Sequence, residues 1–364
     1  MKRKHSARLL SASGARLAAT EVEHRLHYAQ RKRGRGDAGE EVGPEVFIER
    51  TGQSMILSVS RRTDIPNYYF DWFCNRIQEG FLHVRNPMNE RQVSYIDLSP
   101  EVVDCIVFWT KNPAAMLGQL PVFRHYPYYV QFTLTGYGRD VEPGLPNKPV
   151  VLMETFRTLS RRIGESRVIW RYDPILFNPV YTPAYHLKAF AKIAEGLEGY
   201  TKRVVISFVD PYARIQKNMN SLKVRDLPEK ELLLFAKQLA DLAGKHHMEV
   251  ESCAELFDLE AAGIRRGSCI DARLIEEITG CRILAGKDKY QRKECGCVES
   301  IEVGTYNTCR SGCRYCYANY SEAAVQNHTR LYDPHAPLLC GVEGEKDKLT
   351  VRKMKSLLDR QLSI

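Results

Sequence analysis

Three cysteines near the carboxyl end of the sequence have the types and spacing of metal ligands. Cys309, Cys313 and Cys316 lie in TYNTCRSGCRYCYANY, where they form a C-x3-C-x2-C pattern. This spacing lets three thiolates converge on one centre from a short loop, and Gly312 allows the backbone to fold tightly around it. Three thiolates are one ligand short of a closed zinc or iron–sulfur site. The motif therefore predicts a centre whose fourth position is filled from elsewhere or left open for a ligand.

The number and placement of the cysteines favour metal or redox chemistry over disulfides. The chain has 11 cysteines in 364 residues, too few for a secreted disulfide scaffold, and most lie between Cys253 and Cys316. The first residues, MKRKHSARLLSASGARLAAT, are basic but lack the apolar core of a secretory signal. We find no run of about 18 apolar residues, so we expect no membrane span. These features predict a cytoplasmic protein.

Short apolar, β-branched runs alternate with helical stretches from Met55 onward, and they must position the cysteines. Near-continuous apolar strands between helical patterns such as Glu231–His246 indicate parallel β/α units that are buried on both faces. The expected strands lie within Met55–Asp64, Val103–Pro113, Tyr128–Gly136, Arg167–Pro174, Arg203–Pro211, Met248–Glu255 and Ser300–Thr308. Seven units predict an α/β fold with a full or partial TIM-like barrel; an open parallel sheet is the alternative.

Polar side chains follow nearly every expected strand. In parallel barrels the chemistry collects at the carboxyl ends of the strands, so these residues predict a lined pocket. They are Arg61, Arg62, Asp64, Thr110, Lys111, Thr133, Thr135, Arg171, Asp173, Asp210, Cys253 and Glu255. Among them, Lys111 and Asp173 are candidates for hydrogen bonding to a polar substrate. The cysteine loop also lies between an expected strand and an expected helix, which places it at the same face.

The chain divides into three expected parts. Residues 1–54 form a disordered basic extension or an over-long gene start whose true beginning is Met55. Residues 55–340 form the β/α barrel, with a cysteine region at about 253–320, and residues 341–364 form a helical tail. The formal net charge of +9 gives weak support for nucleic-acid binding, since most such surpluses are solvated surface.

The sequence around the cysteines, CRSGCRYC, resembles the cluster loop of the radical S-adenosylmethionine (SAM) superfamily, with an aromatic residue, Tyr315, before the last cysteine. The longer pattern resembles one bacterial family, the domain-of-unknown-function family eighteen-forty-eight. The similar stretches are SRRTDIP, VFWTKNP, FTLTGY, VIWRYDP and CGC…YNTC..GC.YCYAN, and they span roughly Met55 to Leu339. The resemblance brings no established substrate.

The resemblance implies a [4Fe–4S] cluster held by Cys309, Cys313 and Cys316. The open iron would chelate the amino and carboxylate groups of SAM, and Tyr315 would lie near the adenine. Reductive cleavage of SAM would then start radical chemistry on a small-molecule or macromolecular substrate that the sequence does not indicate, with no catalytic residue assigned. Such an enzyme needs an electron donor such as flavodoxin or ferredoxin. A structural zinc ribbon is the alternative, although its usual signature has two C-x2-C pairs.

Two features depart from the superfamily pattern. Its cluster loop normally follows the first barrel strand, and it commonly has a Gly-Gly-Glu stretch, which we do not find here. A circular permutation would reconcile the first departure, with the Ser300–Thr308 strand beside Met55–Ser60. SRRTD would then replace the missing stretch: Arg61 or Arg62 pairs with the SAM carboxylate, and Asp64 accepts from its ammonium. An ordinary ion pair between these arginines and Asp64 is the alternative.

Four further cysteines flank the first motif: Cys253, Cys269, Cys295 and Cys297. Each alone is typical of a small buried side chain. Because they are four, and the family resemblance includes CAE, CID and CGC, we interpret them as ligands of a second iron–sulfur cluster that relays electrons or binds substrate. A structural zinc and unligated thiols are the alternatives.

A second class of function is compatible with the same residues. A non-catalytic protein, stabilised by an iron–sulfur or zinc site, could bind nucleic acid through the basic first segment. Salt-sensitive binding would distinguish it from an enzyme.

Overall fold

The computed structural model describes residues 46–48, 55–210, 212–352 and 354–363. The expected extension at residues 1–54 therefore lies outside the described residues, apart from the short strand β1 (Val46–Ile48). No described helix is long and apolar enough to cross a membrane.

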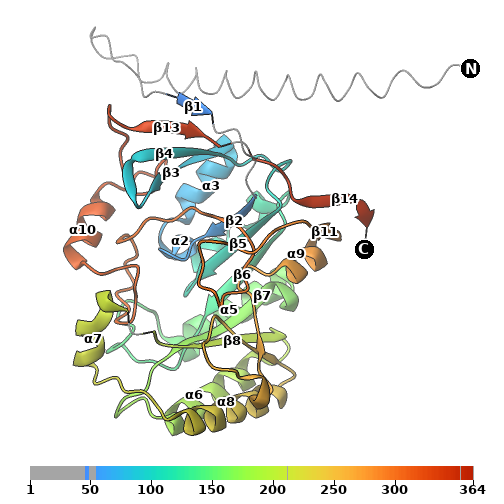
Figure 1. Cartoon of the computed structure of the whole chain (residues 1–364), viewed down its shortest axis with the longest axis vertical. Helices are drawn as coiled ribbons and strands as arrows, with labels where there is room; N and C mark the ends of the chain where they lie inside the picture. Colours follow the sequence, from blue (N-terminus) through green and yellow to red (C-terminus); the bar gives the residue numbers. More distant parts are fainter. Residues whose placement is uncertain (1–45, 49–54, 211, 353, 364) are drawn as a thin grey trace, which may run out of the picture. The chain divides into compact units, whose positions relative to one another are not determined.

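Eight parallel strands form the central sheet (Figure 1); seven of them were predicted from the alternating pattern, and the short edge strand β10 was not. Their order across the sheet is β10 (Arg265–Arg266), β9 (Glu249–Ser252), β8 (Arg203–Phe208), β7 (Val168–Ile175), β6 (Tyr128–Thr133), β5 (Cys105–Thr110), β2 (Ile56–Val59) and β12 (Ile301–Glu302). The edge strands β10 and β12 do not pair with each other in the described part of the chain, so the hydrogen bonding does not close a full barrel.

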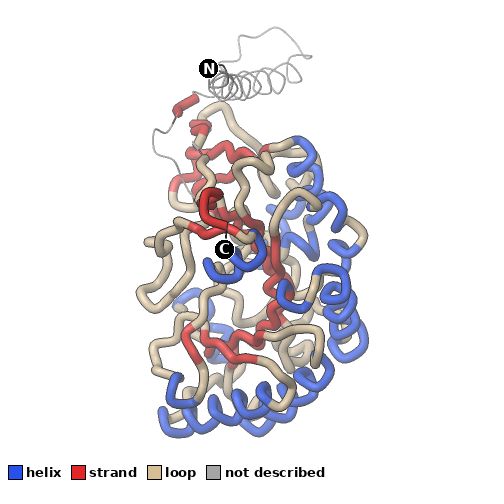
Figure 2. The backbone as a smooth tube through the Cα atoms, turned by 90° about the vertical axis from the view of Figure 1, so that its right-hand side faces the viewer, coloured by secondary structure: helices blue, strands red, loops and turns tan. Residues whose placement is uncertain are grey.

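Most helices lie along one side of the strand layer, with loops on the other (Figure 2). The α-helices are α2 (Ile65–Tyr68), α3 (Phe70–Glu79), α4 (Ala114–Leu117), α5 (Met153–Ile163), α6 (Pro183–Leu197), α7 (Gln216–Ser221), α8 (Glu229–Gly244), α9 (Ala272–Thr279) and α10 (Glu322–Arg330). Short turns of other helix types are η1 (Leu120–Phe123), η2 (Lys148–Leu152), η3 (Glu165–Arg167), η4 (Ala213–Ile215) and η5 (Glu260–Ala262).

Both faces of the sheet are buried, which explains the near-continuous apolar runs. In β5, Ile106 and Phe108 join the core that the helices cover. Cys105 and Val107, which alternate with them, join a second core on the opposite face. Each fully buried apolar side chain of this size contributes about 1.5–3 kcal/mol, so a strand buried on both faces is held firmly in register. The second core also contains Cys269 and its neighbouring cysteines.

A second, smaller sheet was not predicted. It has the order β1–β13–β4–β3, in which β3 (Phe81–Asn86) and β4 (Asn89–Asp97) form an antiparallel hairpin. The prediction of a helical tail at residues 341–364 is wrong, because that segment contains β13 (Lys348–Val351) and β14 (Leu358–Ser363). β13 pairs with β4, and β14 pairs with β11 (Cys281–Ile283). Long-range pairing to strand edges therefore decides the structure of this segment.

The late strand β12 pairs in parallel with β2. The register places Ile301 opposite Leu57 and Glu302 opposite Ser58. The predicted adjacency of these two segments is confirmed, although only two residues of the expected Ser300–Thr308 strand are extended.

Candidate functional site

The carboxyl ends of β12 and β2 are joined by a carboxylate whose side chain is 11% exposed. Glu302 accepts hydrogen bonds from the Ser58 hydroxyl at 2.9 Å and from the Arg61 backbone N–H at 3.1 Å. It also contacts the Ser60 hydroxyl. A side chain at Gly304 would collide with Ser60, so the two loops approach as closely as glycine permits. The chain therefore enters the cysteine loop directly beside the SRRTD segment.

The cysteine loop is closed by its own hydrogen bonds. Asn307 has a φ of +54° and Gly312 a φ of +65°, two left-handed positions that turn the backbone sharply. The Asn307 N–H donates to the carbonyl of Ala318 at 2.9 Å, and the Asn319 amide donates to the carbonyl of Cys309 at 2.6 Å. The three thiols are thus carried on a short, self-supported turn between β12 and α10.

The three thiols of this loop are free and close enough to influence one another. None forms a disulfide, and burial raises the pKa of each of them, to about 11 for Cys309. The neighbouring thiols Cys309 and Cys316 raise the pKa of Cys313 further. Without a metal the three groups stay protonated at neutral pH. A bound metal would have to displace their protons, as thiolate ligation always requires.

The cysteine loop offers three free thiols as possible ligands. In the described residues, no group of three or more Cys, His, Asp or Glu side chains is arranged so that it could hold a metal ion. Each thiolate of a cluster binds a different iron, so the ligands of a cluster need not meet at one point. Three free thiols on one turn match that requirement, and they provide three ligands rather than four.

A buried ion network packs against the cysteine loop. The Lys111 ammonium donates to Glu142 Oε1 at 2.8 Å and to the Tyr315 hydroxyl at 2.7 Å, and Tyr315 in turn donates to Glu142. The other carboxylate oxygen of Glu142 accepts from Thr135 at 2.8 Å and from Lys148. Tyr315, expected near an adenine, therefore has its hydroxyl in this network.

The charges in this network are set by mutual neutralisation. Burial alone would raise the pKa of Glu142, but Lys111 and Lys148 outweigh it and hold that pKa at about 2. The Glu142 side chain is 1% exposed, so its charge depends on these two lysines. Lys111 also lies close enough to Cys313 to lower the pKa of that thiol. The network therefore supplies a surplus positive charge beside the cysteine loop.

The SRRTD residues are already engaged with protein groups. The Arg61 guanidinium forms an ion pair with Glu302 at 3.3 Å, and Arg62 donates to the carbonyl of Gly304 at 3.3 Å. Asp64 caps α2 by accepting from the Asn67 N–H at 3.1 Å, and it also accepts from the Lys111 N–H at 2.8 Å. Burial raises the pKa of Asp64 to about 6.

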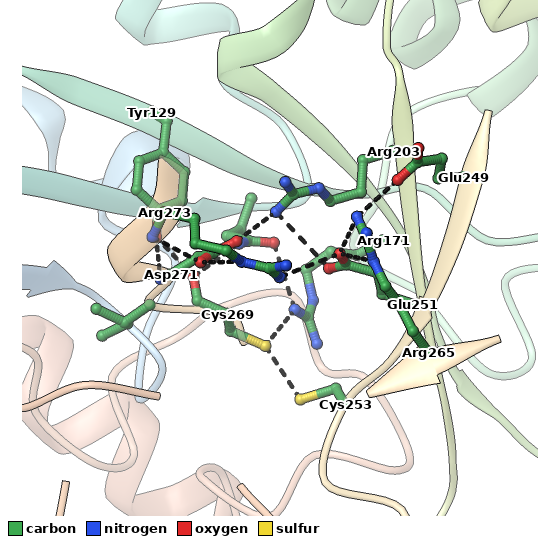
Figure 3. A network of polar contacts seen from close by, with 12 residues as sticks. Tyr129, Arg171, Arg203, Glu249, Glu251, Cys253, Arg265, Cys269, Asp271 and Arg273 are labelled. Carbon is green, nitrogen blue, oxygen red and sulfur yellow. Dashed lines mark hydrogen bonds and ion pairs between the residues drawn. The ribbon is translucent and has the colours of Figure 1, made fainter. Parts of the chain in front are cut away.

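The second cysteine group lies in and against the second core, on the face of the sheet opposite the core that the helices cover. Cys253 follows β9, Cys269 follows β10, and the Cys253 and Cys269 sulfurs lie 3.0 Å apart (Figure 3). The Cys297 thiol contacts both Cys269 and Cys295, which changes the pKa values of all three. The structure therefore links the four predicted cysteines, from three separate segments, in a chain of pairwise contacts, although within the described residues they do not form a group that could hold a metal ion.

Charged and polar side chains hold the turn that carries Cys269. The Arg171 guanidinium donates to the Cys269 sulfur at 2.8 Å, and the Tyr129 hydroxyl donates to the Cys269 carbonyl at 2.8 Å. Arg203 pairs with Asp271 at 2.7 Å, at the start of α9 (Figure 3). This turn is consequently fixed to β6, β7 and β8, and a cation lies directly on one sulfur.

Sequence reasoning missed Glu142, Lys148 and Glu302. None belongs to a motif; Glu142 and Glu302 acquire partners from distant segments, such as Tyr315 for Glu142, while Lys148 binds groups of its own loop. Only Glu302 had a feature in the sequence that could have indicated a site residue, namely its position at the end of an expected strand. Lys111, by contrast, was predicted as a pocket residue from its place after β5.

The fold and site define an α/β protein with a parallel sheet, free thiols and a buried ion network at the carboxyl ends of its strands. Residues 56–318 match the family described as Domain of unknown function (DUF1848), and the chain belongs to this family. The match confirms the predicted family resemblance.

Two further comparisons add little. No curated protein matches the chain. One solved structure, a putative alpha-L-fucosidase from Bacteroides thetaiotaomicron, is similar at 9% identity over 80% of this chain and 98% of that chain, with a TM-score of 0.27. A TM-score this low carries no argument about function.

Proposed function

We propose that the chain is a radical SAM-like iron–sulfur enzyme that acts on an unidentified substrate. The observation that carries the proposal is the parallel pairing of β12 with β2. Parallel strands present their carboxyl ends at one edge, so this pairing sets Cys309, Cys313 and Cys316 beside the SRRTD loop. When bound, the cluster and SAM would supply one-electron cleavage of the sulfonium and hydrogen abstraction from the substrate.

A circularly permuted partial barrel accounts for the late position of the cysteine loop. In this interpretation β12 takes the place of the first barrel strand, and β2, β5, β6 and β7 follow it across the sheet in the usual sequence. The support is the strand order itself, because β12 occupies the edge next to β2 although it comes last of the eight along the chain.

The proposed roles of the chain's own residues are binding and orientation. Arg62 uses only part of its fork of donors on the Gly304 carbonyl and stacks over the Tyr306 ring at 4.8 Å, so we place the SAM carboxylate there first. Arg61 is the second candidate, since its guanidinium is shared with Glu302. Asp64 would hold the SAM ammonium with the lone pairs that its two backbone partners leave free, and Tyr315 would border the adenine through its ring.

The second cysteine group is proposed to hold an auxiliary cluster with Cys253, Cys269, Cys295 and Cys297 as ligands. Its support is the contact among four free thiols from three segments, with the Arg171–Asp173 ion pair beside Cys269. An auxiliary cluster here would receive electrons from a donor such as flavodoxin or ferredoxin, or would bind substrate directly.

Anaerobic reconstitution followed by a 5′-deoxyadenosine assay tests the proposal. The wild type should bind about four irons per chain for one cluster and about eight for two. Reductant and SAM should then yield 5′-deoxyadenosine, and Cys313→Ala should abolish this product while the matched control Cys281→Ala retains it. Cys253→Ala should lower the iron content by about half and keep the first cluster.

Two results would contradict the proposal. The first is a reconstituted wild type that makes no 5′-deoxyadenosine with any candidate substrate. The second is a colourless zinc protein that binds DNA or RNA in a salt-sensitive manner, which would favour the non-catalytic alternative.

A further inference from the structure

A cleft of about 600 Å³ lies between α5, α6 and the segment of residues 134–149 that connects β6 to α5. This volume suits a small organic molecule. The lining residues do not include any of the seven cysteines discussed above or the three SRRTD residues, so the cleft is separate from the proposed cofactor site.

The charges around the cleft are strongly unbalanced. Four cations line it: Arg139, Lys148, Arg157 and Lys192. One carboxylate, Glu142, lies among them, and it is already neutralised by Lys148 and by Lys111 behind it. Any occupant thus meets a net positive field, which favours an anion.

The rest of the lining is largely apolar. Leu134 and Leu145 are buried in its wall, and Met153 and Ile193 contribute from α5 and α6. The Arg157 guanidinium is held in place by donating to the carbonyl of Gly196 at 2.8 Å. An apolar wall edged by cations is the lining that matches an amphipathic anion rather than a free inorganic ion.

The cleft shares a wall with the cysteine loop. The Gly144 N–H donates to the carbonyl of Ser311 at 3.0 Å, and the Arg314 N–H donates to the carbonyl of Val141 at 2.9 Å. Glu142 lines the cleft and also contacts Tyr315 of the cysteine loop. A ligand in the cleft would therefore lie one residue layer away from the cysteine loop.

We propose that this cleft binds an organic anion, with a phosphate, sulfonate or carboxylate head on an apolar body. The head lies between Arg139 and Lys192, whereas Lys148 is already engaged with Thr135, the Tyr137 carbonyl and Glu142, and the body lies against Leu145 and Ile193. This site goes beyond the proposed function and does not depend on iron–sulfur chemistry.

Calorimetric titration of the full chain with 8-anilinonaphthalene-1-sulfonate, an aromatic anion, tests the site. The wild type should bind about one molecule, and Lys192→Glu should bind it about tenfold more weakly, because a charge reversal within several ångströms acts through partly screened solvent. Lys188→Glu is the matched control: Lys188 is also exposed on α6 but does not line the cleft, so binding should be unchanged. Adding Arg139→Glu to Lys192→Glu should weaken binding further.

The neutral analogue N-phenyl-1-naphthylamine separates the charge from the apolar contact. Its weaker binding should be the same in the wild type and in Lys192→Glu. Equal losses of the anion in Lys192→Glu and Lys188→Glu, or no binding of the anion by the wild type, would overturn the proposal. Cys313→Ala should bind the anion normally, so failure here and failure of the proposed enzyme function give different results.

Discussion

Replacing Glu142 by glutamine removes the carboxylate that Lys111 and Lys148 share. Glutamine keeps one acceptor oxygen, but it leaves two ammonium groups facing each other across a neutral amide. The lysine side chains are only 17% and 13% exposed, so water can solvate them only in part. The fold should therefore lose stability through uncompensated charge rather than through lost volume.

The magnitude follows from the burial of the partners. Breaking a buried pair by removing one member costs about 3–5 kcal/mol. Because both lysines keep some exposure, and one hydrogen bond to the amide survives, we expect a value near the lower limit, about 3 kcal/mol. Removing the second charge as well, in Glu142→Gln/Lys148→Met, should recover part of this loss, with a coupling energy of about 1–2 kcal/mol.

Urea unfolding of the metal-free chain, followed by circular dichroism, measures these differences as shifts of the midpoint at constant slope. Glu154→Gln is the matched control, since Glu154 pairs with Arg161 at 3.0 Å on the exposed face of α5 and should change the midpoint little. A Glu142→Gln midpoint equal to that of the wild type would refute the reasoning. So would a double variant less stable than Glu142→Gln alone.

Three further predictions concern packing and pH. Gly144→Ala should lower the free energy of unfolding in urea by about 1–3 kcal/mol, because the new Cβ would lie 2.7 Å from the Ser311 carbonyl oxygen. In the control Gly118→Ala the new Cβ has no atom within 4 Å, so this variant should lose little stability. Equal unfolding midpoints of the two variants would contradict the close packing at Gly144. Burial lowers the pKa of His186 to about 4, so the folded state resists protonation of this side chain between about pH 6.5 and 4 while the unfolded state accepts the proton. The free energy of unfolding of the wild type, measured relative to His186→Gln, should therefore fall by about 3 kcal/mol over this pH range. The pKa of Asp64 is raised to about 6, so the folded state takes up a proton first, and the wild type should gain stability relative to Asp64→Asn as pH falls from 6 to 4; a constant difference would argue against this.

Local patterns predicted the central sheet because its strands are buried on both faces. Such strands are nearly continuous in apolar residues, and the helices between them have clear periodicity, as in α8. The smaller sheet gave no comparable signal. The first four residues of β4 are exposed and polar, and β13 pairs with β1 and with β4, each from more than 250 residues away. Strand pairing between segments so far apart in the chain produces no periodic pattern of apolar residues in the local sequence.

The candidate site divides in the same way. The cysteines were predictable because their side-chain chemistry is rare and their spacing is short. Glu142 and Glu302 were not, since a carboxylate in a loop is ordinary until the fold surrounds it. Arg61 was predicted as a ligand-binding residue, and its partner in the structure, Glu302, lies 241 residues further along the chain. The partner in an ion pair therefore depends on the tertiary structure, whereas a charged residue at a strand end can be predicted from the local sequence.

The position of the cysteine loop follows from the need to cover a strand edge. β2 pairs with β5 on one side, and without a second neighbour its other side would present buried backbone groups with no partner. β12 supplies those partners with only two residues, and the side chain of Glu302 extends the link by binding Ser58 and the Arg61 N–H. Because the pairing is parallel, whatever follows β12 must lie next to whatever follows β2, however far apart the two segments are in sequence. The cysteine loop and the SRRTD loop are thus brought together by the direction of one short strand, and a variant that weakens the Glu302 link should separate them before it disturbs the remaining sheet.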